Sequence, residues 1–203
     1  MWRSIGFPPT CFRSAVAPRA KKGVSVGEVI ALDEKRRRLR ARRAFHLWER
    51  RFGRLFDENT SVQDLPDEVL AVLVQPGDAG TRLVQSLVVK VMTGEDAADL
   101  EGLTPPQKIR AIDLTLLMVD QIRFECMRRL GWVEPDPRAQ WPIVDLLIRH
   151  ADGNAQEVQR TPSLLPSHPL YAQYEKTFVG DQAAFVRRLI PRAIEEFVHR
   201  RKS

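Results

Sequence analysis

The stretch of the chain with the clearest chemical potential is residues 33–56, which carry nine arginines and one lysine against three acids. A guanidinium group is always charged, and its planar fork matches the oxygens of phosphates and carboxylates. Several such groups on one surface would therefore bind a polyanion. The same composition is also found on the solvated face of an ordinary helix, which is the more common origin of a run of charges.

A helical projection of this stretch separates its arginines from its large apolar residues. At 100° per residue, an arc of about 80° contains no acid and only one apolar residue, Leu47. The arginines in this arc are Arg36, Arg40, Arg43, Arg50 and Arg54. The opposite arc, about 100° wide, is predicted to face the core and holds Ala41, Phe45, Trp48, Phe52, Leu55 and Phe56. The five arginines would form a stripe about 27 Å long at 1.5 Å per residue.

Three interpretations of the stripe are open: plain solvation, binding of an acidic protein surface or a nucleic-acid backbone, and peripheral membrane contact. A solvated face usually mixes charges of both signs at i,i+4, whereas like charges repel here. This favours partner binding slightly over solvation. Aromatic residues opposite arginines are also found in interfacial membrane helices. Because a helical bundle can bury those aromatics instead, membrane contact is the least favoured interpretation.

The charge of the whole chain is unevenly distributed. Residues 1–54 contain fifteen basic and four acidic residues, a net charge of +11, whereas residues 55–203 have a net charge of −5. Such segregation is a hint of a nucleic-acid contact or an acidic partner. Alternatively, the basic helix packs on the acidic part of its own chain, and the protein is a structural or regulatory subunit without a nucleic-acid role.

A long helix must hold the arginines in register. Ser25 and Glu28 form a potential capping box, and no proline follows before Pro66, which predicts a helix from there to about Phe56. Residues 1–24 precede it and are predicted to be a disordered basic tail outside the fold, which comprises residues 25–203. Their lack of acids is also typical of organellar transit peptides and leaves import into an organelle open.

A second long helix is predicted over residues 105–130. Thr104, Pro105 and Gln107 give it a capping box with proline in the first turn, and Gly131 suits its C-terminal cap. Its middle is apolar on most sides, which is typical of the centre of a bundle. Shorter helices are predicted over residues 65–75, 79–92, 143–150 and 170–178, and a last one begins after Asp181. The sequence therefore predicts an all-α bundle of five to seven helices around the 105–130 helix.

Catalytic motifs are not recognisable in the sequence. The turn at Gln75–Gly80 lacks the Lys-Ser/Thr pair of a phosphate-binding loop, and no His-Glu-x-x-His or Gly-x-Ser-x-Gly pattern is present. Asp113, Asp120 and Glu125 each have an arginine three or four residues away, which favours structural ion pairs. We assign no catalytic residue, metal ligand or cofactor, and we favour a non-catalytic protein.

The two cysteines, Cys11 and Cys126, are far apart and form no pair motif. This favours the cytoplasm or another reducing compartment. No run of apolar residues is long enough for a transmembrane helix. Together with the scattered histidines, the cysteines also make a zinc site an unfavoured interpretation.

Overall fold

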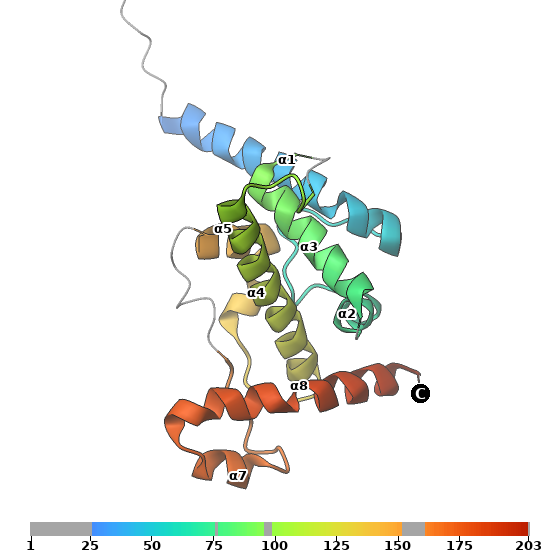
Figure 1. Cartoon of the computed structure of the whole chain (residues 1–203), viewed down its shortest axis with the longest axis vertical. Helices are drawn as coiled ribbons and strands as arrows, with labels where there is room; N and C mark the ends of the chain where they lie inside the picture. The colour runs from blue at the N-terminus through green and yellow to red at the C-terminus, as the bar shows by residue number, and fades with distance from the viewer. Residues whose placement is uncertain (1–25, 76, 96–98, 152–160, 203) are drawn as a thin grey trace, which may run out of the picture.

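The computed structural model describes residues 26–75, 77–95, 99–151 and 161–202. Within these residues the chain forms a bundle of α-helices and one short 3-10 helix, η1, which confirms the all-α prediction (Figure 1). The elements are α1 (Val26–Phe52), α2 (Asp67–Val74), α3 (Asp78–Thr93), α4 (Pro105–Arg129), η1 (Pro137–Gln140), α5 (Ile143–Ala151), α7 (Tyr171–Lys176) and α8 (Val179–Lys202). The predicted tail, residues 1–24, and Ser25 of the predicted capping box lie outside the described residues.

Helix α4 lies at the centre of the bundle and contacts α2, α3, α5 and α8. It begins where the sequence predicts, because Thr104 donates to Gln107 Oε1 from its backbone nitrogen at 2.9 Å and from its hydroxyl at 2.8 Å. It ends before Gly131, whose φ of 71° lies in the left-handed region that favours glycine. Local capping chemistry thus sets both ends of the central helix.

Not every apolar residue of α4 is buried. Leu114, Met118 and Ile122 lie in the core, but Ile109 and Leu116 are 71% and 60% exposed. A helix that is apolar on most sides does not reveal which side its neighbours will cover. The described elements cover only part of α4, and the side with Ile109 and Leu116 stays open.

Helix α1 packs mainly on α3. Phe45 and Trp48 are completely buried, and the indole nitrogen of Trp48 donates to the carbonyl of Leu83 at 3.0 Å. The ring of Phe56 lies 5.5 Å from that of Phe45 and 5.8 Å from that of Trp48. This aromatic cluster fixes the C-terminal half of α1 against the bundle.

The prediction that α1 continues to Phe56 is wrong. The helix ends at Phe52, and Gly53 follows with φ of 64° and donates to the carbonyl of Glu49 at 2.8 Å. Glycine adopts this left-handed conformation without steric cost, so it ends the helix earlier. As a result Leu55, which was predicted to face the core, is 91% exposed.

Helices α2 and α3 approach closely at Gly80. A Cβ on this residue would lie 2.6 Å from the carbonyl oxygen of Leu73 and 2.8 Å from that of Val72. We therefore expect Gly80→Ala to lower the free energy of unfolding by about 1–3 kcal/mol, although alanine for glycine in an open helix stabilises by about 0.5–1 kcal/mol. Urea unfolding measures this, with Ala79→Ser on the exposed side of α3 as control. A more stable Gly80→Ala variant would contradict the close contact.

None of the helices in the described residues is long and apolar enough to span a bilayer. The same residues contain two isolated β-bridges, between Ser61 and Pro142 and between Val133 and Leu164. These bridges tie connecting segments to one another beside the helices, and they do not extend into a sheet.

Candidate functional site

The predicted arginine stripe lies on the outside of the bundle. Figure 1 shows α1 crossing over α3, with its N-terminal turns projecting past the other helices. Five exposed residues make up the predicted stripe, namely Arg36, Arg40, Arg43, Arg50 and Arg54. Four of them lie on α1, and Arg54 follows the end of the helix.

The buried side of α1 agrees with the predicted one to within about 20° on the projection. Ala41 and Ala44 are completely buried together with Phe45 and Trp48. Their mean direction lies about 50° from that of Phe45 on the projection. The side that faces solvent is therefore centred near Arg50, and Arg40 lies at the edge of the core contact. Ala44 lies just outside the predicted arc and is buried as well, because small side chains pack where helices approach closely.

Arg40 is the member of the predicted stripe that lies at the edge of the core contact. It lines a small pocket of about 260 Å³, together with Val91 of α3, Gln107 of α4 and Leu147 of α5. Exposed basic residues that the prediction left out, Lys35 and Arg42, share the solvent side instead. The basic surface of α1 is thus wider than the predicted stripe, and we call Lys35, Arg36, Arg42, Arg43 and Arg50 the arginine face.

Part of the basic charge is paired within the chain. Arg54 lies 3.0 Å from Glu68, and Arg38, on another side of α1, lies 3.0 Å from Glu58. Arg43 donates to the carbonyl of Gly94, and Arg36 also has an interaction partner within the chain. Among the described residues, no carboxylate forms a salt bridge with Arg50.

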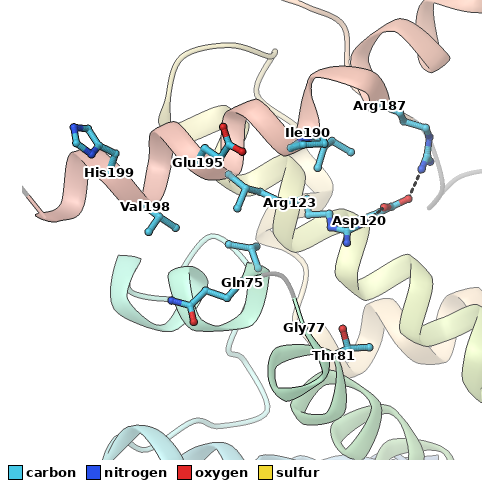
Figure 2. Close-up of a pocket in the computed structure, with 13 residues that line it drawn as sticks. Gln75, Gly77, Thr81, Asp120, Arg123, Arg187, Ile190, Glu195, Val198 and His199 are labelled. Atoms are coloured by element: carbon cyan, nitrogen blue, oxygen red, sulfur yellow. Dashed lines mark hydrogen bonds and ion pairs between the residues drawn. The ribbon is translucent and has the colours of Figure 1, made fainter.

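A second feature is a pocket of about 710 Å³ between α8 and the ends of α2 and α3, with α4 beside it (Figure 2). Asp120 of α4 and Arg187 of α8 form an ion pair at one end, and His199 lies at the other. Arg123 Nη1 lies 3.6 Å from Asp120 Oδ1. The sequence predicted the pairing of Asp120 with Arg123, but Arg187 is 67 residues away and no local pattern reveals it.

The three carboxylates of α4 have different surroundings. Asp113 is exposed, and its Oδ2 accepts a hydrogen bond from His150 Nε2 at 2.8 Å. Glu125 is buried and accepts from Arg128 Nε at 2.8 Å and from Arg129 Nε at 3.0 Å. The predicted arginine partners of Glu125 are therefore the observed ones, whereas the contact between Asp113 and His150 joins two helices.

Asp113, Asp120 and His150 do not all line one pocket. Asp113 and Asp120 both line a small pocket of about 180 Å³, but His150 does not line it. His150 is buried, and its Nδ1 has no hydrogen-bond partner among the described residues. Those residues also contain no cluster of three or more histidine, cysteine, aspartate or glutamate side chains that could hold a metal ion.

The thiol of Cys126 lies in the core of α4. Burial raises its pKa from 9.0 to about 12, an effect that Arg129 partly opposes. We expect this thiol, in a Cys11→Ser background, to react with a disulfide reagent at pH 8 only when the protein unfolds. Rapid labelling of the folded protein would contradict the burial.

The raised pKa of Cys126 also predicts a dependence of stability on pH. The contribution of the protonated, buried thiol to the free energy of unfolding is fully present below pH 9 and is lost as the pH rises towards 12.

Comparison with known proteins does not inform the function of this chain. No family model, curated protein or solved structure matches this chain. Its function must therefore be inferred from its own residues, and the two features that offer one are the arginine face and the pocket beside α8.

Proposed function

We propose that the chain is a non-catalytic interaction module that binds a nucleic-acid backbone through the arginine face of α1. The observation that carries the proposal is the exposure of these basic side chains to solvent, although Arg43 also donates to the carbonyl of Gly94 at the end of α3. From Arg36 to Arg50 they extend over about 21 Å of helix. Such a row can contact several phosphates at once, each through a guanidinium fork.

The composition of the surface favours phosphates over an acidic protein surface. Between residues 42 and 51 the solvent side of α1 exposes Arg42, Arg43, His46 and Arg50, while Phe45 and Trp48 are buried in the bundle. Exposed aliphatic residues on this helix, Leu32 and Leu39, lie nearer its N-terminus. Stable protein interfaces usually contain central aromatic or aliphatic anchors. Phosphate contacts need no such anchor, and they carry affinity without reading the base sequence.

The attachment of α1 supports the same proposal. The buried aromatic cluster and the hydrogen bond from Trp48 to Leu83 fix the C-terminal half of the helix. The arginines there are consequently held on a rigid element before any ligand binds, which lowers the entropy cost of binding. An α-helix of this width also fits the major groove of B-form DNA, which is about 12 Å wide.

A second candidate function is that of a structural or regulatory subunit in which the basic segment binds its own chain. The ion pairs of Arg54 with Glu68 and of Arg38 with Glu58 favour it. However, α3, on which α1 packs, carries Arg82 and Lys90 against one acid, Asp78. Helix α3 therefore offers little acidic surface to the basic helix. The polar contacts between them include the hydrogen bonds of Trp48 to the carbonyl of Leu83 and of Arg43 to that of Gly94.

Chromatography on heparin tests the proposal. A variant with Arg36, Arg43 and Arg50 all changed to glutamate should elute at a much lower salt concentration than the native chain. A matched variant with Lys176, Arg188 and Arg192 changed to glutamate, all exposed on α7 and α8, should lose far less affinity. Equal elution of the first variant and the native chain would rule out polyanion binding through α1.

The cysteine content of the chain bears on the cellular compartment in which it works. With two distant cysteines, of which Cys126 is buried and free, we propose the cytoplasm or another reducing compartment. A role at an anionic membrane surface is a less favoured form of polyanion binding, because the aromatic residues of α1 are buried in the bundle.

A further inference from the structure

The pocket beside α8 combines an apolar wall with a charged end (Figure 2). The wall comes from α2 and α8 and consists of Val74, Ile190, Ile194 and Val198. The charged end is formed by Asp120 and Arg123 of α4 with Arg187 of α8. The volume of about 710 Å³ falls within the range of about 300–1,000 Å³ that is usual for small-molecule sites. Such a pocket suits a ligand with a polar head and an apolar body.

The group of Asp120, Arg123 and Arg187 has one more positive charge than it has negative charges, and Glu195, drawn beside Arg123 in Figure 2, balances this charge in the pocket as a whole. Asp120 accepts a hydrogen bond from Arg187, and its other oxygen lies 3.6 Å from Arg123 Nη1. This second distance is too long for a hydrogen bond. One carboxylate therefore serves two guanidinium groups, and a second anion at this end would be attracted.

Arg123 has hydrogen-bond donors to offer to that anion. Its side chain is 38% exposed, and its Nε is buried. Among the described residues, the guanidinium group of Arg123 makes no hydrogen bond. A guanidinium group binds a carboxylate with two parallel N–H bonds in its preferred geometry. Helix α4 holds the backbone of Arg123 one turn from that of Asp120, so the position from which its side chain enters the pocket is set by a rigid element.

We propose that this pocket binds a small amphipathic carboxylate. The carboxylate head pairs with Arg123 at the charged end, and the apolar body lies along Ile190, Ile194 and Val198. Glu195, an exposed residue of α8, also lines the pocket and repels an anionic head. Its charge therefore lowers the affinity, which distinguishes a charged ligand from an uncharged one of the same shape.

Titration calorimetry with three probes of equal chain length, octanoate, octanol and octylammonium, tests the proposal. The two ionic probes are used below their critical micelle concentrations and octanol below its solubility limit. We expect saturable binding of octanoate at one site, and binding at least about tenfold weaker for the other two, because a hydrogen bond to a charged group is worth about 1.5–3 kcal/mol. Arg123→Gln should weaken octanoate binding about tenfold or more and leave octanol binding unchanged. Arg192→Gln, an exposed position of α8 outside the pocket, is the matched control.

Glu195→Gln keeps the test decisive if Arg123→Gln does not fold, because the Glu195 side chain is exposed and forms no ion pair with a described residue. This variant should bind octanoate more tightly than the native chain does and should bind octanol equally well. Equal affinity for the three probes, no saturable binding of octanoate, or an unchanged octanoate affinity in both variants would overturn the proposal.

Discussion

Raising the salt concentration from 50 to 200 mM is expected to weaken binding of a mixed-sequence DNA duplex by about 150-fold. The figure follows from four contacts, through the four arginines of the arginine face, at a log–log slope of about −0.9 per phosphate. These arginines are Arg36, Arg42, Arg43 and Arg50. Five contacts, as the sequence predicts, would weaken binding by about 500-fold over the same range of salt concentration. The smaller value is expected because Arg54 lies beyond the end of α1 and pairs with Glu68. Fluorescence anisotropy of a labelled duplex measures the slope.

Changing Arg36, Arg43 and Arg50 to glutamine should reduce this salt dependence to about threefold to fourfold, the value for one remaining contact. Glutamine removes the charge without adding repulsion, so the change in slope counts contacts. Poly-glutamate serves as a competitor that has carboxylates in place of phosphates. If poly-glutamate binds as tightly as the duplex, the partner is an acidic protein surface. An unchanged slope in the glutamine variant would exclude the arginine face as the binding surface.

The second large effect concerns stability. Replacing Arg129 with methionine should lower the free energy of unfolding by about 3–5 kcal/mol, because it removes one member of a largely buried ion network. Arg129 donates to Glu125 and Asp67 and also to the backbone carbonyls of Gln63 and Leu65, at 2.9 and 2.7 Å. It thereby ties the end of α4 to the segment before α2. Thermal and urea unfolding measure the loss.

The neighbouring residue supplies the matched control. Arg128 donates from Nε to Glu125, but its Nη1 and Nη2 are buried without a partner among the described residues. Methionine at this position removes those unpaired donors and keeps most of the apolar stem in place. We therefore expect Arg128→Met to change stability by less than about 1 kcal/mol. Equal losses for the two variants would show that Arg129 has no special role in joining α4 to α2.

The sequence was informative where structure is decided locally. The caps of α4 depend on Thr104, Gln107 and Gly131, which lie within a turn of the helix ends, and both ends were predicted correctly. Gly53 is a local signal of the same kind, which the prediction of a helix to Phe56 does not take into account. The prediction for Leu55 failed for this reason, since a residue beyond the helix does not keep the helical periodicity.

The rest depends on contacts between distant parts of the chain. The burial of Ala44 on α1, just outside the predicted arc, follows from how closely this helix approaches its neighbours, which a projection of one helix does not include. The pocket beside α8 needs Asp120 and Arg187, which are 67 residues apart. Helical periodicity predicts the apolar face of one helix, but it does not predict which face of another helix that apolar face contacts.

The most direct test of the central claim observes the arginine side chains themselves. In NMR spectra of the folded chain, addition of a DNA duplex should shift the Nε–Hε signals of Arg36, Arg43 and Arg50 and leave those of Arg188 and Arg192 on α8 unchanged. Shifts that are confined to α8, or none on α1 at saturating duplex, would contradict the assignment of α1 as the binding surface.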